Sequence, residues 1–112
     1  MNARAETSLW IAQRLSALVL ALCVAVHLAT IAIAVKGGLS AAEILARTRG
    51  SIVWAAFYGA FVLAVAIHAP IGLRTIARET LGWRGKPLEA AAAALAVALA
   101  VLGWRAVAGL FA

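Results

Sequence analysis

Hydrophobic residues in this chain fall into three long runs bounded by charged residues. The first run holds 21 uncharged residues between Arg14 and Lys36, and the second holds 24 between Arg49 and Arg74. The third covers residues 88–110 and carries one charge near each end. About 20 apolar residues cross a hydrocarbon core of roughly 30 Å as a helix. The pattern therefore predicts three transmembrane helices, at about 9–35, 51–78 and 88–110.

A further short helix is predicted in the loop after the first run. Gly37 and Gly38 end the first helix, and Ser40 and Glu43 then have the Ser-x-x-Glu spacing of a capping box. We expect a helix at about 40–48 that lies in the membrane interface.

The composition excludes a water-soluble enzyme fold. Hydrophobic residues make up 66% of the chain and charged residues only 12%, so a core built in water would lack polar residues to cover it. We therefore expect an all-α integral membrane protein that forms a single transmembrane domain over residues 1–112.

Basic residues set the expected orientation of the chain. The formal net charge is +6, and the Lys and Arg residues lie at the borders of the apolar runs rather than in a stripe suited to nucleic acid. Six of them flank one side of the predicted bundle: Arg4, Arg14, Arg74, Arg78, Arg84 and Lys86. The positive-inside rule then places the N-terminus in the cytoplasm and the C-terminus outside the cytoplasmic membrane. We expect membrane lipids, and no nucleic acid, as partners.

The two histidines, His27 and His68, are ionisable groups inside predicted spans, which makes them candidate functional residues. Helical spacing places His27 on a polar stripe with Gln13, Ser16, Cys23 and Thr30. It places His68 on a stripe with Trp54, Phe57, Phe61, Gly72 and Thr75. The aromatic residues of this stripe form a wall on one side of His68, and the small residue on the other side leaves room for a flat ligand. Either histidine can instead hydrogen-bond to a neighbouring helix, which is worth about 1 kcal/mol and needs no ligand.

Two short motifs in the first two spans carry a family resemblance. Residues 68–79 read His-Ala-Pro-Ile-Gly-Leu-Arg-Thr-Ile-Ala-Arg-Glu, and residues 13–17 read Gln-Arg-Leu-Ser-Ala. They resemble the His-x-x-x-Gly-x-Arg-His-x-x-x-Asp and His-Arg-x-Ser-Gly motifs of the cytochrome b membrane-anchor subunit of succinate dehydrogenase and fumarate reductase. Four positions depart from these motifs. Gln13 and Thr75 each replace a histidine, Ala17 replaces a glycine, and Glu79 replaces an aspartate.

The resemblance implies roles for several residues. His68 would be an axial ligand of haem b, Gly72 would leave space beside the macrocycle, and Arg74 would pair with a haem propionate. Arg14 and Ser16 would lie near a quinone site where the iron–sulfur subunit docks. Neutral imidazole and a fixed guanidinium suit these tasks chemically.

The two histidines are expected at different depths in the membrane. Counted from the bounding charges, His27 lies about 20 Å and His68 about 9 Å from the cytoplasmic boundary. Because axial ligands of one iron lie at nearly equal height, we favour two stacked haems, with His68 on the cytoplasm-proximal haem and His27 on the distal one, as in dihaem members of the family. The third span has no His, Met or Cys. Each iron would therefore need its second ligand from a second membrane subunit or a second copy of this chain.

We interpret the chain as a haem b-binding anchor that docks flavoprotein and iron–sulfur subunits and passes electrons to or from quinone. It has neither a dinucleotide-binding glycine motif nor a cysteine set for iron–sulfur clusters, so no catalytic residue is expected on it. One alternative is a haem-free transporter or channel subunit in which Arg14, His27 and His68 line an ion path. Another is the haem anchor of a different quinone-linked dehydrogenase, such as a hydrogenase or formate dehydrogenase.

Overall fold

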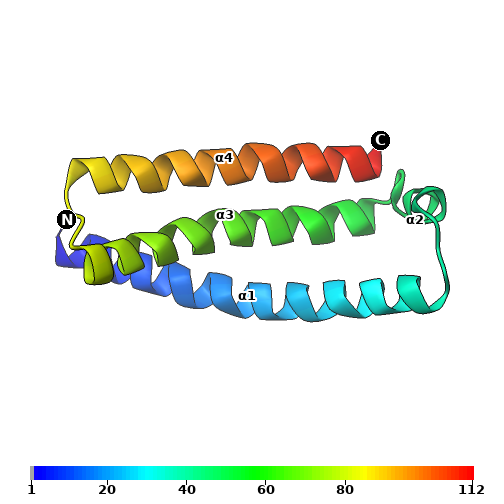
Figure 1. The fold of residues 1–112 in the computed structure, drawn as a ribbon, viewed down its shortest axis with the longest axis horizontal. Helices are drawn as coiled ribbons and strands as arrows, with labels where there is room; N and C mark the ends of the chain where they lie inside the picture. The colour runs from blue at the N-terminus through cyan, green and yellow to red at the C-terminus, as the bar shows by residue number, and fades with distance from the viewer. Residues whose placement is uncertain (1) are drawn as a thin grey trace.

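The computed structural model describes residues 2–112 as four helices joined by short turns. They are α1 (Ala3–Lys36), α2 (Ala41–Thr48), α3 (Ile52–Leu81) and α4 (Lys86–Phe111). The three long helices are apolar enough to cross a membrane, and α2 lies in the connection between α1 and α3 (Figure 1). The predicted three-span plan with a short helix in the first loop is confirmed.

Helix α3 occupies the middle of the bundle. It packs against α1 on one side and α4 on the other, whereas α1 and α4 make little contact with each other (Figure 1). The N-terminus and the α3–α4 turn lie at one end, which we call the N-terminal end, and α2 lies with the C-terminus at the other, the α2 end. Helix α3 therefore connects α1 to α4.

Two helices extend beyond the approximate limits predicted for them, which followed the apolar runs. Helix α1 begins at Ala3 rather than near residue 9, since the side chain of Asn2 caps it by accepting a hydrogen bond from Ala5 N (2.8 Å). Helix α3 continues to Leu81, where Gly82 adopts the left-handed conformation (φ +66°) that ends helices. Polar residues thus extend both helices beyond the apolar runs.

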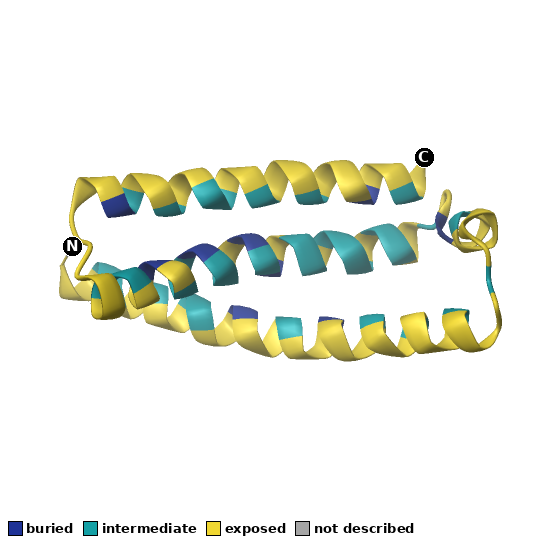
Figure 2. Cartoon of the chain, in the orientation of Figure 1, coloured by how far each residue is buried: buried dark blue, intermediate teal, exposed yellow. Residues whose placement is uncertain are grey.

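Apart from Thr48 of α2, the buried residues lie on the faces that the three long helices turn toward each other (Figure 2). Small side chains dominate there, including Cys23, Ala64 and Ala66. At the α3–α4 contact Gly103 faces Val62 so closely that a Cβ on Gly103 would overlap the valine side chain. Such close approach of small residues is typical of helices that pack in lipid, where the large apolar side chains face outward.

Helix α2 has the predicted capping box. Ser40 Oγ accepts a hydrogen bond from Glu43 N (3.2 Å), and Glu43 Oε1 accepts one from Ser40 N (3.1 Å). The backbone N–H of Ser40, helped by its hydroxyl group, holds the pKa of the Glu43 carboxyl below its ordinary value.

The α2 end is closed by hydrogen bonds to the last turn of α4. Thr48 Oγ1 donates to Leu110 O (2.9 Å), and Gly50 N donates to Phe111 O (2.9 Å). Carbonyl groups in the last turn of a helix have no partner within that helix, and here the first loop supplies two of the missing donors. The loop thereby joins α4 to the α1–α3 connection.

Candidate functional site

His68 is held by a chain of hydrogen bonds that begins on α1. Ser16 Oγ donates to Gln13 O (3.0 Å) and lies 3.3 Å from Nδ1 of His68. A serine hydroxyl has one proton. When Ser16 gives that proton to Gln13 O, its oxygen can accept from His68 Nδ1–H, and the lone pair of Nε2 is then left for a metal, as in the outer shell of many histidine ligands.

His27 has a different partner, the hydroxyl group of Tyr58, 3.1 Å from its Nδ1. The ring centroids of His27 and Tyr58 are 5.7 Å apart with perpendicular planes, and Phe61 makes a similar edge contact at 5.6 Å. No second hydrogen bond fixes the Tyr58 hydroxyl within residues 2–112, so it can donate to Nδ1 or accept from it. The tautomer of His27 is therefore not set by this contact.

The aromatic wall expected beside His68 contacts His27 instead. Trp54, Phe57, Tyr58 and Phe61 pack on one another, and the last two touch the His27 ring. Sequence spacing placed the wall on the correct helix, but it could not show that α1 brings His27 to that level. Tyr58 was missed because it lies about 100° around the helix from the stripe through Phe57; its signal is that it is the only tyrosine in the chain.

The two imidazoles lie at clearly different depths. Ser16 marks the level of His68 on α1, and Tyr58 marks the level of His27 on α3. The ten residues from Tyr58 to His68 correspond to about 15 Å along α3. This separation exceeds the offset of about 10 Å expected from the bounding charges. Both rings on one iron would require nearly equal heights, so these positions disfavour a shared iron.

Gly72 makes room for the side chain of Gln13. A Cβ built on Gly72 would lie 3.2 Å from Gln13 Nε2, closer than most side chains approach. The other amide atom, Gln13 Oε1, is buried and has no hydrogen-bond partner among the described residues. The space expected beside a macrocycle at Gly72 thus holds Gln13, which presents an unsatisfied acceptor.

Arg74 is buried in an ionic cluster that joins all three long helices. Its guanidinium donates to Glu6 of α1 (2.9 Å) and to Glu89 of α4 (2.7 Å), and Arg78 reaches Glu6 at 3.2 Å. Only 6% of the Arg74 side chain is exposed. Sequence reasoning missed both carboxylates because they lie near the ends of other helices. The pairing of Arg74 with a propionate stays a prediction, and its contacts in this structure include these two glutamates.

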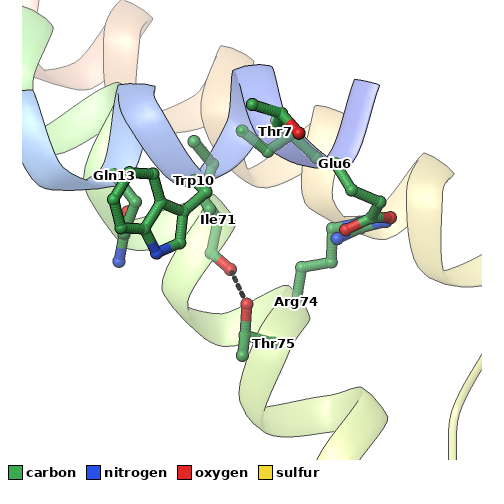
Figure 3. A pocket seen from close by; sticks show the side chains of 8 residues that line it. Glu6, Thr7, Trp10, Gln13, Ile71, Arg74 and Thr75 are labelled. Atoms are coloured by element: carbon green, nitrogen blue, oxygen red, sulfur yellow. Dashed lines mark hydrogen bonds and ion pairs between the residues drawn. The ribbon is translucent and has the colours of Figure 1, made fainter. Parts of the chain in front are cut away.

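An open cavity of about 510 Å³ lies between α1 and α3 beside this cluster (Figure 3). Its lining combines Trp10 and Ile71 with polar groups from Glu6, Gln13 and Arg74. Arg14 and Ser16, the residues expected near a quinone, are not part of the lining. Ser16 lies against His68, and the exposed Arg14 places its guanidinium 5.3 Å from the Trp10 ring centroid, at the edge of the cavity.

The donor set of the described residues suits a porphyrin-bound iron better than a bare ion. Residues 2–112 contain no cluster of three His, Cys, Asp or Glu side chains that could surround a metal. A haem iron needs only axial ligands from the protein, and His68 has Nε2 available while Nδ1 contacts Ser16. His27 offers the same atom once Tyr58 accepts from its Nδ1–H.

Comparison with known proteins gives one family match. The family model for the succinate dehydrogenase/fumarate reductase transmembrane subunit matches residues 1–107. No curated protein and no solved structure matches the chain significantly. The family match covers nearly all of the sequence, including all the candidate residues described above.

Proposed function

This chain belongs to the family of succinate dehydrogenase/fumarate reductase transmembrane subunits, and from that premise we propose that it binds haem b. Membership makes it a membrane anchor subunit of such a complex and implies association with flavoprotein and iron–sulfur subunits. Its three long apolar helices make it a multi-pass membrane protein. The proposal assigns axial ligation to His68 and His27 and places their haems in separate layers of the membrane.

The observation that carries the proposal is the hydrogen-bond chain behind His68. Ser16 Oγ lies within hydrogen-bond distance of both Gln13 O and His68 Nδ1, so it can donate to the carbonyl while it accepts from Nδ1–H. That arrangement leaves Nε2 unprotonated, which is the tautomer that axial ligation requires. Haem, when bound, supplies one-electron redox chemistry, and the task of His68 is to hold Nε2 toward the iron.

A second haem at His27 follows from the separation between the two rings. Layers about 15 Å apart are too far for one iron and suit two stacked haems. Each of these irons would take its other axial ligand from a second membrane subunit or a second copy of this chain, because α4 has no His, Met or Cys. By the positive-inside rule the His68 haem would lie toward the cytoplasm, with the C-terminus outside the cytoplasmic membrane.

The cavity between α1 and α3 is the part of the chain best suited to quinone. Its apolar walls fit a ring, and the buried Gln13 Oε1 would accept a hydrogen bond from a hydroquinone hydroxyl group. Arg14 lies at its edge through its contact with Trp10. Electrons would pass between the iron–sulfur subunit docked at this end and quinone, with Arg74 and the neighbouring glutamates fixing the cavity wall.

Haem counting in the purified complex tests the proposal. We expect a b-type band in the reduced spectrum, two haems with separate midpoint potentials, and loss of a different haem in His68→Ala and His27→Ala. The matched control is Cys23→Ala, which alters a buried side chain on the same face of α1 and should leave both haems. In His68→Gly, added imidazole should restore the missing band, which separates ligation from folding.

Two results would contradict parts of the proposal. A wild-type complex without a b-type band would overturn haem binding altogether. If His27→Ala left haem content and both midpoint potentials unchanged, His27 would be a structural partner of Tyr58, and one haem at His68 would remain.

A further inference from the structure

A second cavity, strongly basic, lies at the N-terminal end of the bundle between the start of α1, the last turns of α3 and the first turn of α4. Its volume is about 520 Å³. Four basic side chains and two carboxylates line it: Arg74, Arg78, Arg84, Lys86, Glu6 and Glu89. Four positive and two negative charges give the lining a formal charge of +2.

This positive excess is located on the α3–α4 turn. Both carboxylates are already engaged, Glu6 with Arg74 and Arg78, and Glu89 with Arg74. Arg84 and Lys86, in contrast, form no ion pair with any residue of the described chain. Two cations therefore line the cavity without a protein counter-charge.

The backbone of the turn concentrates positive charge at the same place. Gly82 (φ +66°) and Gly85 (φ +83°) take the left-handed region on either side of Trp83 and Arg84 and reverse the chain within four residues. Helix α4 then begins at Lys86 without a side-chain cap. Its unpaired backbone N–H groups add the partial positive charge of a helix N-terminus to that of Arg84 and Lys86.

An apolar groove beside the turn indicates the depth of this cavity. The groove has a volume of about 300 Å³, is lined by Leu81, Trp83 and Leu95 among others, and shares Arg74 and Leu88 with the basic cavity. Tryptophan concentrates at the level of the lipid head groups. The basic cavity therefore lies at the height of the lipid phosphates, with an apolar slot beside it.

We propose that the basic cavity binds the phosphate group of an anionic phospholipid. Arg84 and Lys86 neutralise the head group, and one acyl chain lies in the apolar groove past Trp83 and Leu88. A lipid is favoured over a soluble anion because the site adjoins an apolar groove and lies at head-group depth. The inference uses neither histidine, so it stands whether or not the chain binds haem.

The test compares lipid binding by two charge-matched variants of the purified complex. Arg84→Gln/Lys86→Gln removes the two uncompensated cations, and Arg47→Gln/Arg105→Gln removes two exposed cations at the α2 end. After delipidation, each complex is titrated with phosphatidylglycerol, phosphatidylcholine or inorganic phosphate and followed by native mass spectrometry. At about fivefold per charge, the first variant should bind phosphatidylglycerol roughly 25-fold more weakly than the wild type. The second variant should match the wild type, and Arg84→Lys/Lys86→Arg should retain most of the binding.

Each other outcome overturns the proposal. Equal loss in the two charge-matched variants would mean a general attraction of basic residues to anionic lipid rather than a site. Inorganic phosphate binding as tightly as phosphatidylglycerol would identify a site for a soluble anion. Loss of the iron–sulfur subunit from Arg84→Gln/Lys86→Gln, with lipid retained, would identify a protein-docking surface.

Discussion

The two imidazole sites lie on the same pair of helices and differ in how their Nδ1 atoms are held. Ser16 has a second partner, the carbonyl group of Gln13, to which it can give its proton while it accepts from His68 Nδ1–H. Tyr58 has no second partner within the described chain, so it accommodates either tautomer of His27. A short hydroxyl beside a carbonyl of its own helix thus offers a way to fix an imidazole tautomer, and a phenol without a second partner does not.

The surroundings differ in the same direction. His68 lies toward the N-terminal end, where the Glu6–Arg74–Glu89 cluster ties three helices together. His27 lies toward the α2 end among aromatic rings, which supply apolar surface and little directional bonding. Directional polar contacts therefore lie near His68, whereas His27 is surrounded mainly by packed rings.

Removing the ionic cluster near His68 should have the largest effect, a loss in the free energy of unfolding. Arg74→Gln leaves Glu6 and Glu89 without their shared cation, and because these carboxylates are 39% and 41% exposed we expect a loss of about 2 kcal/mol, less than for a fully buried pair. Thermal unfolding in micelles measures it, and haem at His68 should be lost before haem at His27. Arg78→Gln, which removes only a partly exposed contact, is the control and should cost about 0.5 kcal/mol.

Removing the hydroxyl group beside His68 should have the next largest effect, a loss of haem affinity. Ser16→Ala deletes the acceptor for Nδ1–H, and loss of such an outer-shell bond lowers ligand affinity by about tenfold. Titration of the apo-complex with haem measures the change, and Ser16→Thr, which keeps the hydroxyl, should bind as the wild type does. Unchanged haem affinity in Ser16→Ala would remove the distinction between the two sites.

The equivalent change at His27 should matter less. Tyr58→Phe keeps the ring packing and removes only the hydroxyl group, so we expect haem affinity to fall by about twofold with a shift in the midpoint potential of the distal haem. Redox titration with optical detection measures this shift. A tenfold loss of affinity, as large as that expected for Ser16→Ala, would show that Tyr58 also selects a tautomer.

The smallest expected effect is on the capping box at the α2 end. Because the folded state lowers the pKa of Glu43, its carboxylate stabilises α2 above the ordinary glutamate pKa, and this contribution disappears as the pH falls through the lowered value. Hydrogen exchange of α2 amides should therefore accelerate between about pH 6 and about pH 3, relative to the intrinsic rate. In Glu43→Gln this additional acceleration should be absent, and haem binding should not change.

The fold was largely predictable from the sequence, and the site only in part. Runs of apolar residues fix the number of spans, and Ser40 with Glu43 fixes α2, because both signals are local. The partners of His27, His68 and Arg74 depend on which residues of α1 and α4 meet α3, and no local pattern encodes that register. Helices α1 and α3 extend past the apolar runs for a related reason, since Asn2 and Gly82 lie outside those runs.

The donors that Thr48 and Gly50 give to the last turn of α4 have a consequence for biogenesis. Thr48 and Gly50 are polymerised about 60 residues before Leu110 and Phe111, whose carbonyls accept from them. During synthesis the first loop must therefore wait at the membrane surface with these groups hydrated, and it can settle only after the final span has been inserted. Docking of this loop is accordingly a late event in maturation, because its hydrogen bonds to α4 can form only when the third span is in place.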